Sequence, residues 1–370
     1  MSTEGDGYIP RAMIALCYGT RPQIIKASVL RRALARLGPV HAVDTGQHYD
    51  HALNALLYQE LGVDPPHRFL EVGSGSHAEQ IALMLTRADA VLRELRPRVA
   101  VVIGDTNSTL GTALAATRLG LPVVHVEAGL RSRNRLMAEE QNRRAVDAMA
   151  SLLCTPSAAA TARMQVEHPA ELVRETGDVA YDVLLGARER LPAASSVVPG
   201  LPASYIFSTL HRAELVDDEP ALMGILRALA AIGTPAIFAA HPRTRATLAR
   251  AGVTQDRIGL LRIISPVGYL ECLALTAGAR AVVTDSGGLQ REAYWLGVPC
   301  ITVRAETEWE ETVEAEANRL VPPGDAPRRL AEAVTAQVGR WNGESRWPAR
   351  AYGDGHAALA VATAVEALLS

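Results

Sequence analysis

Acidic side chains follow two apolar segments of the sequence, at the points where these segments end. The segment RVAVVIGD ends at Asp105, and PVVHVEAG carries Glu127. A third acidic pair, Glu139 and Glu140, precedes an amphipathic segment that begins near Asn142. Carboxylates gathered at the mouth of a cleft are typical of proton exchange with a substrate carbon or oxygen. Structural alternatives stay open, because Asp105 also suits a helix N-cap and the two glutamates suit an acidic first turn.

A glycine turn with two nearby cations follows the first apolar segment. AMIALCYG ends in Gly19, Arg21 comes two residues later, and Lys26 lies on the helix expected next. Amide donors, the helix dipole and positive charge together favour a phosphate ligand. An ordinary strand-to-helix turn with a solvated arginine is the alternative.

The most distinctive local feature is a run of small residues after the segment RAVVTD. Ser286, Gly287 and Gly288 open a predicted helix there. Small residues allow the backbone to approach a pyrophosphate, and successive amides at a helix N-terminus donate to it. Glu292, one turn along this helix, is placed to accept both hydroxyls of a ribose. A simple turn is again the alternative.

Two histidines end apolar segments in the second half of the chain. SYIFSTLH ends at His211, and PAIFAAHP carries His241. A histidine that leaves a buried strand among charged residues is a candidate acid, base or phosphate ligand. A structural histidine bonded to a backbone carbonyl is the alternative for each.

The elements that must position these residues are short apolar strands that alternate with helix-period segments. This βαβ rhythm indicates a parallel sheet, and the continuously apolar strands indicate helices on both faces. A second series of such segments begins near residue 204, so we expect two Rossmann-like, doubly wound α/β domains with a cleft between them. We predict an N-terminal domain over 1–180 and a C-terminal domain over 181–354. A helix over 355–370 could pack back on the N-terminal domain, and 179–202 suits a linker.

Composition narrows the class of ligand and the compartment. The 370 residues exceed one ordinary core, and a net charge of −3 provides no general attraction to nucleic acid or to an anionic membrane. No segment approaches the roughly 18 apolar residues of a membrane span. The four cysteines lie far apart, without the spacing of a zinc site or a disulfide framework. We therefore expect a cytoplasmic protein that needs no metal and no cofactor.

Ten motifs, taken in order, resemble those of the UDP-N-acetylglucosamine 2-epimerase family, whose members have the GT-B arrangement of two Rossmann-like domains. The resemblance spans nearly the whole chain. The motifs are GTRPQIIK at 19–26, TGQHYD at 45–50, GDTNST at 104–109, HVEAGLRS at 125–132, EEQNRR at 139–144, TGDVAYD at 176–182, LHRAE at 210–214, AHPRT at 240–244, TDSGGLQREA at 284–293 and TEWEET at 307–312.

The resemblance implies roles for matching positions of this chain. Four residues are expected to be catalytic, namely Asp105, Glu127, Glu139 and His211. The expected substrate and UDP contacts are Arg21, Lys26, Arg131, Arg143, His241, Ser286, Gly287, Gly288 and Glu292. It further implies a UDP-sugar substrate and a homodimer. In the implied reaction a base removes the proton at carbon 2 while UDP leaves carbon 1, so the sugar becomes a glycal, to which UDP and a proton then return.

The chain departs from the family pattern at positions that leave the proposed carboxylates in place. Ala138 stands where the family commonly has proline, Leu215 where it often has asparagine, and Arg291 where glutamate is frequent. We therefore predict a non-hydrolysing epimerase that acts on UDP-N-acetylglucosamine or a related UDP-aminosugar. The alternatives are a hydrolysing epimerase, a glycosyltransferase of the same fold and, from another class, a nucleotide-sugar sensor.

Overall fold

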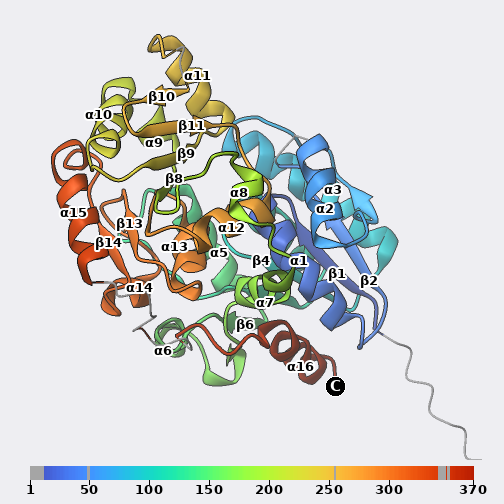
Figure 1. The fold of residues 1–370 in the computed structure, drawn as a ribbon. Helices are drawn as coiled ribbons and strands as arrows, with labels where there is room; N and C mark the ends of the chain where they lie inside the picture. Colours follow the sequence, from blue (N-terminus) through green and yellow to red (C-terminus); the bar gives the residue numbers. More distant parts are fainter. Residues whose placement is uncertain (1–11, 48–50, 254–255, 341–346, 348–350) are drawn as a thin grey trace, which may run out of the picture. The chain divides into compact units, whose positions relative to one another are not determined.

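The computed structural model describes residues 12–47, 51–253, 256–340, 347 and 351–370, so residues 48–50 of the TGQHYD motif lie outside the described part. Internal contacts divide the chain into two units. The first consists of Met1–Val183 together with Tyr352–Ser370, and the second of Leu184–Ala351. Each unit contains one seven-stranded sheet within the described residues (Figure 1).

The sheet of the first unit is parallel and runs in the order β3-β2-β1-β4-β5-β6-β7. Its strands are β1 (Ile14–Tyr18), β2 (Val40–Asp44), β3 (Arg68–Phe69), β4 (Val99–Ile103), β5 (Val123–Val126), β6 (Leu152–Thr155) and β7 (Val173–Glu175). The central strands β1 and β4 are buried along their whole length, because helices cover both faces of the sheet.

Helices of the first unit pack in two groups. They are α1 (Arg21–Leu34), α2 (His51–Leu61), α3 (His77–Leu95), α4 (Asn107–Arg118), α5 (Ala138–Met149), α6 (Ala158–Glu167) and α16 (Ala357–Leu369), with the short 3-10 helix η1 (Ala170–Leu172). Helix α7 (Val179–Ala187) begins in the first unit and ends in the second. Helices α3, α4 and α5 pack side by side, whereas α1 packs against α2 and α16. Because βαβ crossovers are right-handed and the strand order reverses at β1, the two groups cover opposite faces.

The C-terminal helix α16 belongs to the first unit, where a side chain distant in sequence caps its start. The carboxylate of Asp182, on α7, accepts hydrogen bonds from the amides of Ala357 and Ala358 at 3.0 and 2.8 Å. A negative charge at a helix N-terminus also opposes the positive end of the helix dipole. The helix expected over 355–370 therefore has a defined anchor.

The sheet of the second unit runs in the order β10-β11-β9-β8-β12-β13-β14. Its strands are β8 (Ile206–Thr209), β9 (Ala236–Ala239), β10 (Arg257–Ile258), β11 (Leu261–Ile264), β12 (Ala281–Thr284), β13 (Cys300–Thr302) and β14 (Asn318–Leu320). Edge strand β10 is antiparallel to β11, and the other pairs are parallel. Its helices are α8 (Ala194–Val197), α9 (Ala213–Val216), α10 (Glu219–Ala230), α11 (Pro242–Arg250), α12 (Tyr269–Ala277), α13 (Gly287–Trp295), α14 (Glu310–Glu314) and α15 (Ala326–Arg340), with the 3-10 helix η2 (Arg188–Arg190).

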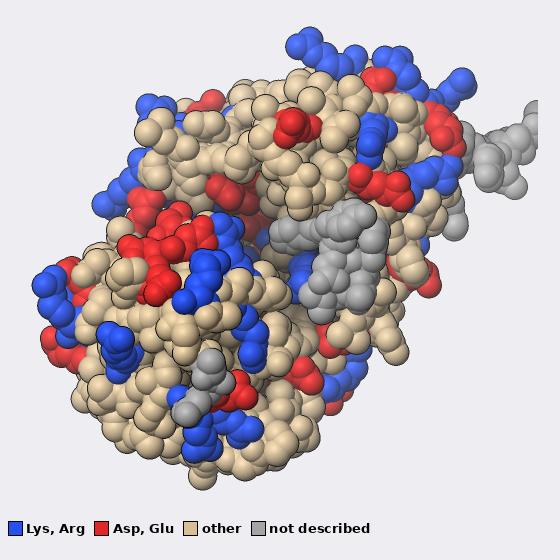
Figure 2. Space-filling model, turned by 90° about the horizontal axis from the view of Figure 1, so that it is seen from above, with Lys and Arg blue, Asp and Glu red and all other residues tan. Residues whose placement is uncertain are grey.

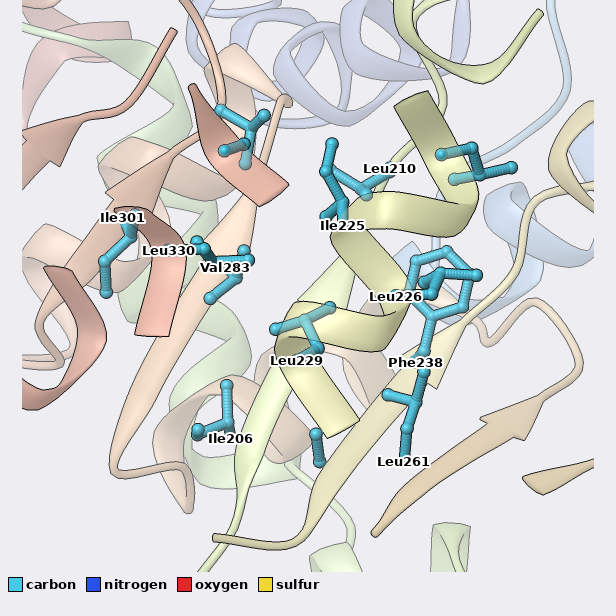
Figure 3. Packing of buried hydrophobic residues seen from close by; sticks show 14 of the residues in the cluster. Ile206, Leu210, Ile225, Leu226, Leu229, Phe238, Leu261, Val283, Ile301 and Leu330 are labelled. Carbon is cyan, nitrogen blue, oxygen red and sulfur yellow. The ribbon is translucent and has the colours of Figure 1, made fainter. Parts of the chain in front are cut away.

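Helix α10 illustrates how the second core forms. Its buried residues repeat at helical spacing and form one apolar face: Leu222, Ile225, Leu226 and Leu229. This face packs on strand residues that include Phe238 and Val283 (Figure 3). In both units, buried apolar residues of helices pack on the central strands of the sheet. The prediction of two Rossmann-like α/β domains is therefore confirmed.

The surface carries charges of both signs. Figure 2 shows basic and acidic side chains interspersed over the face it presents. Because the net charge is −3, we expect an anionic ligand to be bound by a local arrangement of donors and cations rather than by a broad positive field.

Among the residues that the structure describes, no helix is both long enough and apolar enough to cross a bilayer.

Candidate active site

Some candidate residues of each unit follow the strands between which the strand order reverses, which is where open parallel sheets bind ligands. In the first unit the reversal is between β1 and β4, whose carboxyl ends lead to Gly19 and to Gly104. In the second unit it is between β8 and β12, which lead to His211 and to Ser286.

The side-chain amide of Gln23 joins the two loops at the reversal point of the first unit. Its Oε1 accepts from the amides of Gly19 and Thr20 at 2.8 and 3.1 Å. Its Nε2 donates to the carbonyl of Ile103 at 2.6 Å and to Thr106 Oγ1 at 2.9 Å. Both amides at this turn are therefore occupied, which differs from the expectation that they serve a phosphate. Arg21 and Lys26, the two cations of this motif, stay the predicted phosphate contacts.

Gly19 is required for packing at the same turn. A Cβ at this position would overlap the hydroxyls of Thr45 and Ser108, which hydrogen-bond to each other at 2.7 Å. Arg21, the first residue of α1, is half-buried beside this turn. The sequence motif at 19–26 thus combines a packing glycine, an internal clamp and two cations.

Lys26 and Glu127 form an ion pair in the first unit. Lys26 Nζ donates to Glu127 Oε2, and the two side chains are 7% and 11% exposed. Glu127 follows β5 with a φ of +71°, in the left-handed region that costs a non-glycine residue about 1–3 kcal/mol. The backbone is held there because the amides of Glu127 and Ala128 both donate to the carbonyl of Cys154 at 3.0 Å. Such strain is typical of residues placed for function.

Asp105 follows β4 and is held from α5. Its carboxylate pairs with the guanidinium of Arg143, and its backbone carbonyl accepts from Asn142 Nδ2 at 2.9 Å. The N-cap of the following helix α4 is Thr106 rather than Asp105. The carboxylate of Asp105 is thus left to its ion pair instead of a capping bond, and its side chain is 25% exposed.

The paired glutamates of α5 differ completely in their surroundings. Glu140 is fully buried and accepts from the amide of Ser132 at 2.8 Å, Arg143 Nη1 at 3.2 Å and Arg144 Nε at 2.7 Å. Glu139 is half-buried, and its side chain makes no hydrogen bond or ion pair to any residue that the structure describes. Of the two glutamates, Glu139 was predicted to be catalytic, and it is the one whose side chain has no structural partner among those residues.

Arg131, expected to contact substrate, lies in a buried ionic chain. Its Nη1 donates to Asp147 Oδ2 at 2.6 Å and its Nη2 to Glu167 Oε2 at 2.9 Å. Burial by itself would raise the pKa of Asp147, but the hydrogen bonds and charges of His125 and Arg131 outweigh burial and hold that pKa below its usual value. The substrate contact stays a prediction, and the structure gives Arg131 a second, internal function.

His211 follows β8 and is fixed by Asp285, which follows the adjacent strand β12. The buried carboxylate of Asp285 accepts from the amides of His211 at 2.9 Å and Arg212 at 2.8 Å. His211 Nδ1 lies 3.2 Å from the same carboxylate, while 42% of the imidazole side chain is exposed. The ring of His241, N-cap of α11, lies 6.1 Å from that of His211 between centroids. One face of the His211 ring is therefore available to a ligand.

The N-terminus of α13 offers donors that the first unit's turn does not. Ser286 is its N-cap, and the serine hydroxyl accepts from the amide of Leu289 at 3.4 Å. The amides of Gly287 and Gly288 donate to no atom of the described residues. Two adjacent amides at the start of a nine-residue helix suit a diphosphate.

Glu292 lies one turn further along α13, half-buried. Burial raises the pKa of the Cys272 thiol on α12, and the nearby Glu292 carboxylate raises it further. The four cysteines are free thiols, and the described residues contain no group of three or more His, Cys, Asp or Glu side chains arranged to bind a metal.

Four residues of this arrangement were not predicted as functional from the sequence: Gln23, Asn142, Asp147 and Asp285. Each acts through a partner at least 22 residues away, so local pattern does not reveal it. The available signal was position inside a motif, because Gln23, Asn142 and Asp285 all lie within segments that resemble the family.

Two α/β units of this topology define a GT-B-like fold, which this chain shares with solved structures that it resembles. A profile of the UDP-N-acetylglucosamine 2-epimerase family matches residues 35–366. The chain therefore belongs to that family, and its prediction as an isomerase of this family is confirmed.

Similar proteins support the assignment over most of the chain. The UDP-N-acetylglucosamine 2-epimerase of Methanocaldococcus jannaschii is 39% identical over 343 residues, covering 88% of this chain and 92% of that protein. A Pseudomonas aeruginosa UDP-2,3-diacetamido-2,3-dideoxy-D-glucuronate 2-epimerase is 38% identical over 330 residues, covering 87% and 91%. The crystal structure of the M. jannaschii UDP-GlcNAc 2-epimerase in complex with UDP-GlcNAc and UDP superposes with a TM-score of 0.88 at 36% identity, covering 96% and 99%.

Proposed function

We propose that the protein interconverts UDP-N-acetylglucosamine and UDP-N-acetylmannosamine, or a related UDP-aminosugar pair, without net hydrolysis. The observation that carries the proposal is the pair of carboxylates at the ends of adjacent strands β4 and β5. Asp105 and Glu127 each lie against a cation, Arg143 and Lys26 respectively. The substrates of the two relatives named above are consistent with a UDP-aminosugar.

In the proposed reaction a carboxylate of the first unit removes the proton at carbon 2. The electron pair of that C–H bond forms a double bond to carbon 1 while the bond from carbon 1 to UDP breaks. UDP then adds back to the glycal, and a proton arrives at carbon 2 from the opposite face. Asp105, Glu127 and Glu139 are the proposed proton-transfer network. Lys26 and Arg143 would balance the negative charge of the carboxylates and of the departing diphosphate.

The second unit would hold the nucleotide. The amides of Gly287 and Gly288, the Ser286 hydroxyl and the exposed face of His211 support a diphosphate position there. Binding energy from the uridine part of the nucleotide, which does not react, would retain UDP while the glycal exists. The cytoplasmic location and the homodimer inferred from sequence stay predictions.

Solvent exchange tests this chemistry directly. Incubation with UDP-N-acetylglucosamine in deuterated water should produce the 2-epimer with deuterium at carbon 2, because proton removal there is an obligatory step. Proton NMR of the mixture measures both epimer and label. Epimer without deuterium would exclude the elimination route, and free 2-epimeric sugar together with UDP would identify a hydrolysing enzyme instead. Transfer to an added acceptor without any epimer would favour a glycosyltransferase.

Glu292→Ala should weaken UDP binding by about 1–3 kcal/mol, because the charge-assisted hydrogen bonds proposed to the ribose would be lost. Titration calorimetry with UDP measures the change. Glu332→Ala is the matched control, since Glu332 is an exposed carboxylate of the same unit that lies 3.9 Å from Arg319. Unchanged UDP affinity in a folded Glu292→Ala protein would remove the ribose contact.

A further inference from the structure

A fully buried histidine lies against the loop that follows β4 and carries Asp105. His125 is on β5, two residues before Glu127, and its side chain is fully buried. Its Nε2 lies 2.7 Å from the carbonyl oxygen of Gly104, the residue before Asp105. Its Nδ1 lies 2.7 Å from Asp147 Oδ1 on α5. His125 thus connects the end of β4 to α5 from inside the unit.

The two ring nitrogens have different partners. A carbonyl oxygen has no proton to donate, so Nε2 donates to Gly104. Nδ1 lies against the Asp147 carboxylate, whose pKa is held below its usual value because the hydrogen bonds and charges of His125 and Arg131 outweigh burial. Arg131 contacts the same carboxylate and also Glu167, so Asp147 is held from two sides.

The contacts of His125 support the backbone just before Asp105. Gly104 has a φ of +65°, which glycine adopts without strain, so the position of this peptide is set by its hydrogen bonds. Its amide donates to the carbonyl of Val126 at 2.9 Å, and its carbonyl accepts from His125. The next carbonyl, that of Asp105, accepts from Asn142. Two successive peptide units are therefore held by β5 and α5, the elements that also carry Glu127 and Glu139.

We propose that His125, held by Asp147 and Arg131, is a positioning residue that sets the placement of Asp105 relative to Glu127 during epimerisation. This role rests on the proposed function of the two carboxylates. The contact with Gly104 is the essential one, because it reaches the loop, whereas the contact with Asp147 orients the ring. A displacement of about 1 Å in a reacting group can cost about 10²-fold in rate.

Two amide substitutions separate the contacts of the ring. Gln places its side-chain NH2 near the position of Nε2 and keeps a donor for Gly104, whereas Asn places its own near Nδ1 and keeps only the contact with Asp147. We expect His125→Asn to lower kcat about 10²-fold and His125→Gln to lower it much less. The KM for the UDP-sugar and the calorimetric affinity for UDP should stay within twofold, because neither contact reaches the nucleotide.

A structural role alone would give a different pattern. Leu92→Ala, in the buried face of α3, is the control for lost stability, and its kcat should be unchanged. Equal kcat values for His125→Asn, His125→Gln and wild type, or a loss that appears only in KM, would overturn the proposal. If either substitution prevents folding, Asp147→Asn tests the same chain and should lower kcat. An unchanged kcat in that variant would likewise overturn the proposal.

One measurement does not depend on epimerase activity, so it separates failure of this proposal from failure of the proposed function. Amide exchange in the peptide that contains residues 104–107 should be faster in His125→Asn than in wild type or Leu92→Ala. Unchanged exchange of that peptide would overturn the positioning role even in an active enzyme.

Discussion

Replacing Asp105 with asparagine should lower the rate of epimerisation by about 10²–10⁴-fold, the usual cost of removing a positioned acid or base. Asparagine has nearly the same shape and can still accept from Arg143, so the loop after β4 should stay in place. What is lost is the carboxylate's charge and its capacity to take or give a proton. Both kcat and the rate of deuterium entry at carbon 2 should fall in step.

UDP binding supplies the internal control for this variant. Because UDP is proposed to bind the second unit, calorimetry should give the same affinity for Asp105→Asn as for wild type. Asp89→Asn is the matched chemical control, since Asp89 is a carboxylate of the same unit paired with Arg93 at 2.8 Å on the surface of α3. Full activity of Asp105→Asn would remove the residue from proton transfer. A large loss of UDP affinity would place it in nucleotide binding instead.

The elements that carry these residues could be predicted because their signals are local. Runs such as VAVVI at 99–103 are apolar without alternation, which requires a strand covered on both sides, and the structure buries this strand completely. The start of α13 at Ser286 could also be predicted, because serine is a favoured N-cap and the two glycines that follow leave the first amides of the helix accessible. Local chemistry was sufficient in both cases.

The contacts that organise the site could not be predicted, because each depends on how distant segments pack. Gly19 and its following amide looked like phosphate donors, yet the side chain of Gln23 occupies both. The same amide group reaches 80 residues along the chain to Ile103. Periodicity shows which face of a helix is buried, but it does not show which polar group of that face finds which partner.

The adjacent glutamates of α5 show this limit most sharply. Glu139 and Glu140 have the same side chain and both suit an acidic first turn. A helix rotates by about 100° per residue, so packing alone decides which one is enclosed. The structure encloses Glu140 among Ser132, Arg143 and Arg144, which gives Glu140 a structural role, whereas the catalytic role of Glu139 stays a prediction.

Glu140→Ala should therefore lower the free energy of unfolding by about 3–5 kcal/mol, the cost of leaving a buried charge without its partner. Arg143, itself buried, would lose one of its carboxylate partners, and the amide of Ser132 would lose its acceptor. Urea unfolding followed by circular dichroism measures the change. Glu140→Gln, which keeps an acceptor for Ser132 but not the charge, should lose less and serves if the alanine variant does not fold.

Glu139→Ala is the matched comparison, one residue away on the same helix. Its unfolding free energy should stay within about 0.5 kcal/mol of wild type, as for most partly exposed positions without a structural partner. Its kcat should fall about 10²–10⁴-fold, because Glu139 is proposed to transfer protons. The reverse result, a stable and inactive Glu140→Ala beside an active Glu139→Ala, would mean that the buried glutamate moves into the reaction. The ion pairs of Arg143 would then have to rearrange when substrate binds.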